Sequence, residues 1–173
     1  MKKIGASVSG ADFFLAGLAS GIAAFSSAMS VSQHLFAWLC LGGSIAFSFI
    51  ARQINKRMGA HAASVGPWLY VFGLLAISIA TPWLNRMLPA DGYPIQAIAA
   101  GWLTFMVLGG SLLALTDGPL TFQIVPSIAI FGLVGAFDTY PYASALFFVF
   151  IALAASLFFR AHARSMLNQM ELA

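Results

Sequence analysis

Six long apolar segments separated by short links constrain this chain more than any other feature of its sequence. A helix needs about 20 apolar residues to cross the hydrocarbon core of a bilayer, with a range of roughly 17 to 25. Backbone groups that face lipid must be hydrogen-bonded within their own segment, so spans of this kind are predicted to be α-helices. The predicted spans are 11–30, 35–51, 63–84, 95–115, 120–136 and 142–159.

The composition indicates that lipid is the main solvent of the chain. Of its 173 residues, 61% are hydrophobic and 8% are charged, and the mean hydropathy is +0.92. Globular proteins carry about a quarter charged residues, so a chain this poor in charge cannot cover a water-facing surface. Because the links are short, consecutive helices are expected to be antiparallel neighbours. The sequence therefore predicts an all-α, polytopic integral membrane bundle of six transmembrane helices.

The distribution of lysine and arginine predicts the orientation of this bundle. Cytoplasmic loops of membrane proteins carry an excess of both residues. All cations except Arg86 fall on one side of the six spans, which places both termini on the cytoplasmic face of a bacterial inner membrane. The excess of basic over acidic residues is explained by the orientation of the chain during membrane insertion and by anionic lipid headgroups. No nucleic-acid partner is therefore expected. The cations on the shared side are Lys2, Lys3, Arg52, Lys56, Arg57, Arg160 and Arg164.

The residues after the last span, 160–173, keep helical spacing. Met166 and Met170 fall on an apolar face, whereas Arg160 and Arg164 fall on a polar face. This pattern predicts an amphipathic helix that lies along the cytoplasmic surface of the membrane. A linker to a further segment is an equal alternative.

Small residues four positions apart predict tight helix packing in three spans. Such pairs allow two helix backbones to approach closely. We favour packing within the bundle over dimerisation as the use of these faces, because a bundle needs close-packed sides. The pairs are Gly17 with Gly21, Gly42 with Ala46, and Gly132 with Ala136.

Pro126 lies inside the fifth predicted span and is expected to bend it. Proline lacks an amide hydrogen and crowds the carbonyl one turn earlier, here that of Phe122. Gln123 and Ser127 flank the bend and could form a small polar path. We favour the simpler interpretation, in which these side chains satisfy the backbone groups that the proline leaves free.

Ionisable side chains at membrane depth usually indicate transport or proton transfer, because function must offset the cost of their burial. The sequence places none there. Asp12 opens the first span after Ser9 and Gly10, where a carboxylate complements the helix dipole, so capping is favoured over ion coupling. The other acidic residues fall in links or in the tail.

No catalytic, metal-binding or cofactor-binding residues are predicted. His34, His61 and His162 could ligate haem or chlorophyll, but all three lie at span ends and are expected to be solvated. The single cysteine, Cys40, has no CxxC partner and is expected to be a buried thiol. The sequence contains no GxSxG or HExxH motif and no phosphate-binding glycine loop.

Part of the chain, residues 93–166, resembles the N-terminal membrane region of bacterial transglutaminase-like membrane proteins. The carrying stretch is LTFQIVPSIAIFGLVGAFDTYPYASALFFVFIALAASLFFRAHAR. It is similar to a pair of helices in that family: a proline-containing helix, a polar turn reading FDTYP, and an aromatic-rich helix that ends in basic residues. The resemblance implies a membrane anchor for an extracytoplasmic domain that uses Cys, His and Asp.

The chain departs from that family because it ends on the predicted cytoplasmic side, without the further span or the catalytic domain. No active-site residue carries over, and a split or truncated module and a stand-alone relative both remain open. We expect a non-enzymatic membrane anchor or scaffold, with the lipid bilayer and other membrane subunits or a second copy as partners. The alternatives are a small transporter or channel subunit with a path near Pro126, and an accessory subunit of a pigment or redox complex.

Overall fold

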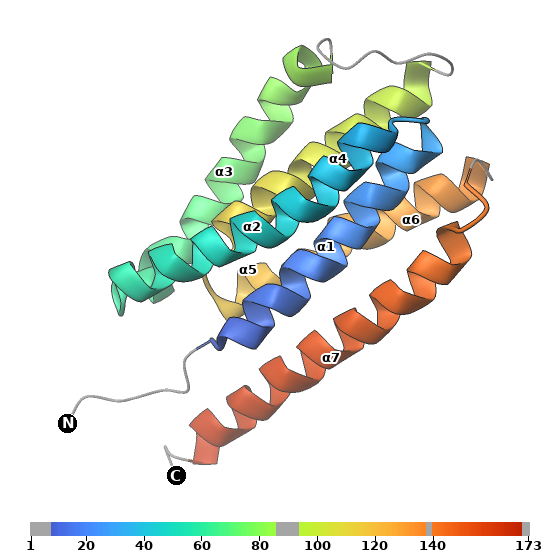
Figure 1. Cartoon of the computed structure of the whole chain (residues 1–173). Helices are drawn as coiled ribbons and strands as arrows, with labels where there is room; N and C mark the ends of the chain where they lie inside the picture. The colour runs from blue at the N-terminus through green and yellow to red at the C-terminus, as the bar shows by residue number, and fades with distance from the viewer. Residues whose placement is uncertain (1–7, 86–93, 138–139, 171–173) are drawn as a thin grey trace.

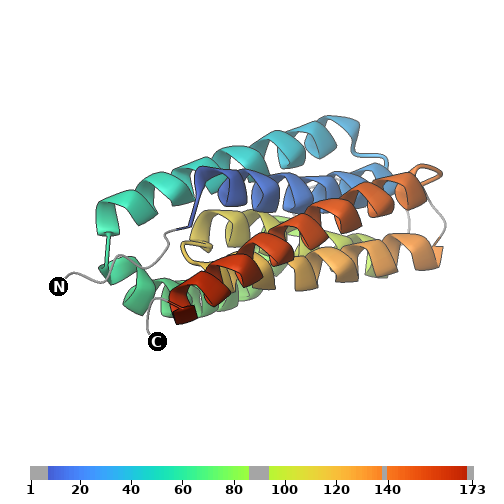
Figure 2. The same cartoon turned by 90° about the horizontal axis from the view of Figure 1, so that it is seen from below.

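The computed structural model describes residues 8–85, 94–137 and 140–170, and every regular element among them is an α-helix. The long helices lie side by side (Figures 1 and 2). The elements are α1 (Gly10–Ser30), α2 (His34–Met58), α3 (His61–Asn85), α4 (Pro94–Leu113), α5 (Asp117–Phe122), α6 (Ile124–Phe137) and α7 (Ala143–Met170).

Five helical segments are long and apolar enough to cross a membrane, which is compatible with a multi-pass membrane protein. The α5–α6 pair counts as one of them, over Asp117–Ala136. The fourth predicted span, 95–115, falls on α4, and the side chains of α4 that the structure describes form the apolar stretch Ile98–Leu113. The other four segments are α1, α2, α3 and α7.

Helix α1 is the centre of the bundle. It packs against α2, α4, α6 and α7, and 67% of its most apolar stretch is buried, compared with 22% for α3 (Figure 1). A Cβ atom on Gly17 would lie 2.6 Å from the Ser48 hydroxyl oxygen, and one on Gly21 would lie 3.0 Å from the Leu41 carbonyl oxygen. Glycine at these two positions therefore lets α1 and α2 approach closely.

The other two small-residue pairs do not lie in tight interfaces of the described bundle. Gly42 and Ala46 are exposed on the outer side of α2, and a Cβ on Gly42 would meet no atom within 4 Å. Gly132 and Ala136 are also exposed, and Gly132 lines a cavity of about 320 Å³ between α6 and α7. The four-residue spacing predicts that a helix has a face of small residues. It does not predict whether that face lies against another helix or on the outside of the bundle.

The regular helix is interrupted three residues before Pro126, where the sequence predicts a bend. Helix α5 ends at Phe122, Gln123 forms a turn, and α6 begins at Ile124. Proline supplies no amide hydrogen to the Phe122 carbonyl, so the regular pattern fails there and not at the proline itself.

The last helix differs from the predicted division between a span ending at 159 and a surface tail. Helix α7 continues through Arg160 to Met170 without a break. Arg164 is buried while Met166 and Met170 are exposed. Residues 160–170 therefore extend α7 and turn their arginines towards the bundle.

Candidate functional site

The polar site begins with the cap of α1. Ser9 is the N-cap, and the amide of Asp12 donates to its hydroxyl oxygen at 3.4 Å. The Asp12 carboxylate accepts in return from the Ser9 amide at 2.8 Å and from the Ser9 hydroxyl at 2.6 Å. This reciprocal capping box satisfies amides that the start of a helix leaves free, and it confirms the capping role predicted for Asp12.

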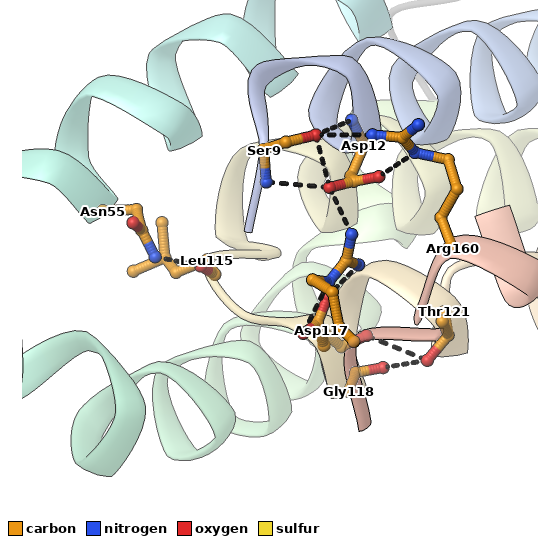
Figure 3. A network of polar contacts seen from close by, with 9 residues as sticks. Ser9, Asp12, Asn55, Leu115, Asp117, Gly118, Thr121 and Arg160 are labelled. Carbon is orange, nitrogen blue, oxygen red and sulfur yellow. Dashed lines mark hydrogen bonds and ion pairs between the residues drawn. The ribbon is translucent and has the colours of Figure 1, made fainter. Parts of the chain in front are cut away.

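Asp12 also forms two ion pairs with the last helix. Arg160 Nε donates to Asp12 Oδ1 at 2.6 Å, and Arg164 Nη1 donates to Asp12 Oδ2 at 2.6 Å. The Asp12 carboxylate lies between Ser9 and Arg160 (Figure 3). Asp12 is completely buried, although Arg160 keeps 41% of its side chain exposed. The first and last helices of the chain are thus joined by charge at one end of the bundle.

Arg164 extends this network to α5. Its Nη2 atom lies 2.5 Å from Asp117 Oδ1, and its Nε donates to Asp117 Oδ2 at 3.4 Å. The planar guanidinium can engage a carboxylate through two nitrogens at once. Arg160 and Arg164 are one helical turn apart, so both reach the same side of α7. We call Ser9, Asp12, Asp117, Arg160 and Arg164 the charge cluster.

Helix α2 reaches the same end of the bundle. A Cβ on Gly10 would lie 2.5 Å from the guanidinium carbon of Arg52, so that side chain covers the first residue of α1. Asn55 Nδ2 donates to the Leu115 carbonyl at 2.5 Å, which attaches α2 to the α4–α5 connection (Figure 3). The ends of α2, α4 and α7 therefore meet the starts of α1 and α5.

The chemistry of the charge cluster is that of a structural junction. Each carboxylate accepts hydrogen bonds from an arginine, and Asp12 accepts from Ser9 as well. Within the described ranges, no group of three His, Cys, Asp or Glu side chains could hold a metal ion. A buried carboxylate and its arginine stabilise the bundle only as a pair. Removal of either partner leaves the other charge buried without compensation, which is strongly destabilising.

A second polar centre lies at the turn between α5 and α6. Tyr70 of α3 donates its hydroxyl to Gln123 Oε1 at 2.6 Å. Gln123 Nε2 donates to the Val107 carbonyl and lies 3.5 Å from the Ser111 hydroxyl, both on α4. A Cβ on Gly110 would collide with the Gln123 amide, so glycine makes room for it. We call Gln123 and these partners the amide node.

The residues predicted to form a polar path are brought together, but their polar groups face protein partners. Gln123, Pro126 and Ser127 are all buried. Ser127 donates to the Gln123 carbonyl at 2.9 Å, one turn earlier in the chain. The carbonyl that Pro126 leaves without an amide donor is that of Phe122, so this bond reaches its neighbour, and the simpler interpretation of the sequence stays a prediction.

The candidate ligands for a pigment are not assembled. His34, His61 and His162 are exposed, and His34 Nδ1 lies 3.4 Å from the sulfur of Met29. Cys40 is completely buried in the core and forms no disulfide.

Comparison with known families, with curated proteins and with solved structures gives no match. The relationship to transglutaminase-like membrane proteins therefore stays a prediction based on residues 93–166.

Sequence reasoning missed the ion pairs of the charge cluster. From the sequence, Arg160 and Arg164 are interpreted as orientation signals and as the polar face of the tail, and Asp12 as a cap, and none of them is paired. A signal was available: the predicted topology places residue 12 and residues 160–164 on the same face, and the two arginines are one helical turn apart. A carboxylate at residue 12 and guanidinium groups at residues 160 and 164, all near helix ends on one face, are candidates for ion pairs.

Proposed function

We propose that this chain is a six-span integral membrane protein of a bacterial inner membrane, with both termini in the cytoplasm, that acts as an anchor or scaffold. Five segments of sufficient length support the membrane location, and α4, with 20 residues, is taken as the sixth span. Arg52, Arg160 and Arg164 gather at the charge-cluster end, which supports the assignment of that end to the cytoplasm.

The observation that carries the scaffold role is how the interior polar groups are used. Asp12 is held by Ser9, Arg160 and Arg164, and the Gln123 amide is held by α3 and α4. Both centres join helices that are distant in the sequence, so they favour one fixed arrangement of the bundle. A rigid, non-enzymatic bundle is suited to presenting a surface to partners.

The partners we propose are the bilayer and another membrane protein or a second copy of this chain. Helices α2, α3 and α7 carry large apolar side chains on their outer sides, among them Trp38 on α2 and Phe159 on α7. In water such a surface would be a liability, whereas lipid tails or a neighbouring helix cover it well. An anchor similar to that of transglutaminase-like proteins is the specific form of this proposal.

Site-directed labelling tests the topology. Single cysteines replace Lys56, near the charge cluster, and Tyr142, near the opposite end, in a Cys40→Ala background. We expect a membrane-impermeant thiol reagent to label residue 142 in intact cells, and residue 56 only after the membrane is opened. Labelling of both residues from the same side would overturn the proposed topology.

A scaffold also predicts a stable association in the membrane. Crosslinking before solubilisation, followed by purification and mass spectrometry, should give one defined partner or a dimer of this chain. A chain that remains uncrosslinked in its native membrane would contradict the scaffold role.

A small transporter or channel subunit is the second candidate, and the break at Gln123 favours it. Interrupted helices often form the binding sites of secondary transporters. Flux measured in liposomes would support this candidate if Gln123→Leu abolished it and Ser144→Ala, in the α6–α7 cavity, did not. Flux that survives both Gln123→Leu and Ser127→Ala would exclude a path at the amide node.

A further inference from the structure

A cavity of about 740 Å³ lies on the side of the bundle between α3, α4 and α5. This volume falls within the range of about 300–1,000 Å³ that is typical of small-molecule sites. We call it the lateral groove. Its walls include Tyr70, Leu74, Leu75, Met106, Pro119 and Phe122.

Of the side-chain hydroxyls that line the groove, those of Tyr70 and Ser78 already have partners, and that of Thr116 lies at one end. The Tyr70 hydroxyl donates to Gln123, and the Ser78 hydroxyl accepts from Trp102 Nε1 at 2.9 Å. The rest of the lining is almost entirely apolar. A ligand that carries polar groups would lose its water without gaining hydrogen bonds, so the walls select a hydrocarbon chain.

The groove opens beside exposed side chains of α3. Val71 and Leu75 line it and are 57% and 56% exposed. In a membrane this side of α3 faces lipid, so an acyl chain can enter without crossing water. The entry route therefore agrees with the chemistry of the walls.

One end of the groove reaches the basic end of the bundle. Thr116, Gly118 and Pro119 line that end, at the start of α5, which also carries Asp117 of the charge cluster. The Asn55–Leu115 hydrogen bond brings the end of α2 alongside the start of α5. The two residues after Asn55 are Lys56 and Arg57, and both are exposed, in reach of the headgroup layer.

We propose that the lateral groove binds one acyl chain of an anionic phospholipid, whose headgroup phosphate is held by Lys56 and Arg57. The proposal rests on the membrane location and orientation given under Proposed function. Apolar walls account for the chain, and the two cations at the end of α2 account for the preference for an anionic headgroup. The lipid would fill the space between α3 and α5, which the protein itself leaves open.

The test is native mass spectrometry of the full chain, titrated with phosphatidylglycerol and with phosphatidylcholine of the same acyl chains. Gly118→Phe adds a ring to the groove at a position where a Cβ meets no atom within 4 Å. Gly42→Phe is the matched control, because it is equally open but lies on α2 outside the groove. We expect Gly118→Phe to weaken binding of both lipids about tenfold, and Gly42→Phe to leave it unchanged.

The headgroup is tested with Lys56→Gln and Arg57→Gln, alone and combined. Each should weaken binding of phosphatidylglycerol about fivefold, since a cation near an anionic surface contributes on the order of 1 kcal/mol. Binding of phosphatidylcholine should change little. The double substitution Lys2→Gln/Lys3→Gln removes the same charge from another segment and serves as the control.

Equal binding by the wild type and by Gly118→Phe would overturn the groove as the chain site. Equal affinity of the wild type for the two lipids would overturn recognition of the anionic headgroup. Labelling of residues 56 and 142 in the same cells separates these failures from failure of the membrane topology. Correct labelling combined with unchanged lipid binding would remove the lipid site and leave the proposed topology intact.

Discussion

Asp12 and Gln123 are both almost completely buried, at 0% and 2% exposure, but they lie at different depths and carry different charge. Asp12 belongs to the charge cluster at one end of the bundle, where Arg160 and Asp117 are each 41% exposed. Gln123 lies six residues beyond Asp117, about 9 Å further along a helix. Charge is thus kept beside the solvated end, and a neutral amide is used deeper inside.

The physical reason for this difference is the cost of removing a group from water. A charge far from water is very costly even when it is paired, whereas a neutral amide needs only its hydrogen bonds. The charge cluster therefore depends on access to solvent at its rim, and the amide node depends on full satisfaction by protein groups. This comparison predicts different consequences when each centre is damaged.

The largest loss should follow removal of the Asp12 carboxylate. In Asp12→Ala, Arg164 keeps only Asp117 as a partner, and α1 loses its capping carboxylate. We expect a loss of about 3–4 kcal/mol in the free energy of unfolding, measured by steric trapping in bicelles. Asp117→Ala is the matched control and should cost less than half as much, because Asp117 is partly exposed. Equal losses would contradict the central position of Asp12.

A substitution that disturbs packing without changing charge gives a reference for these losses in the free energy of unfolding. In Gly17→Val the new side chain would press on Ser48 and on the backbone of Ser44, so we expect a loss of about 2 kcal/mol. Gly42→Val adds the same atoms on the open side of α2 and should change the free energy of unfolding by less than about 0.5 kcal/mol. If both variants behaved alike, the close approach of α1 and α2 would be refuted.

Damage to the amide node should have a smaller effect. Gln123→Leu keeps apolar bulk but leaves the Tyr70 hydroxyl without its acceptor, while the Val107 carbonyl keeps its bond from the Ser111 side chain. We expect a loss of about 1–2 kcal/mol, in the range of hydrogen bonds between helices in membranes. Tyr70→Phe in the Gln123→Leu background should recover part of that loss, as thermal unfolding of the two proteins would show. A loss as large as that of Asp12→Ala would remove the distinction between the two centres.

The smallest effect is expected at the exposed rim of the charge cluster. Arg160 contacts Asp12 through one nitrogen and keeps 41% of its side chain in contact with solvent. Arg160→Gln should cost less than about 1 kcal/mol, and the difference from the wild type should shrink as salt is added. A large loss that is insensitive to salt would indicate that Arg160 is buried in the membrane.

The helical segments were predictable because each depends on its own residues. Apolar runs predict where the long helices lie, but α2 continues past 51 to Met58 and α7 past 159 to Met170. Hydropathy marks where lipid contact ends, whereas a helix continues while its backbone hydrogen bonds do. The bounds of the lipid-facing part and of the helix therefore differ where polar residues follow.

The two polar centres were harder to predict, because each requires helices that are distant in the sequence to meet at a given rotation. Asp12 and Arg164 are separated by 152 residues, and Tyr70 and Gln123 by 53. Gly42 and Ala46 had the correct spacing for packing but face outwards. Sequence spacing defines a helix face, and only the packed bundle determines which neighbour that face meets.

A double-mutant cycle between Asp12 and Arg164 tests the central claim, that a buried ion pair joins the first helix to the last. The free energy of unfolding is measured in bicelles for the wild type, Asp12→Ala, Arg164→Met and the double variant. Methionine keeps much of the apolar stem of Arg164, so the cycle reports mainly on charge. We predict a coupling energy of about 2 kcal/mol or more, with the double variant more stable than the sum of the single losses implies. Losses that add to within about 0.5 kcal/mol would contradict the ion pair as the closure of the bundle.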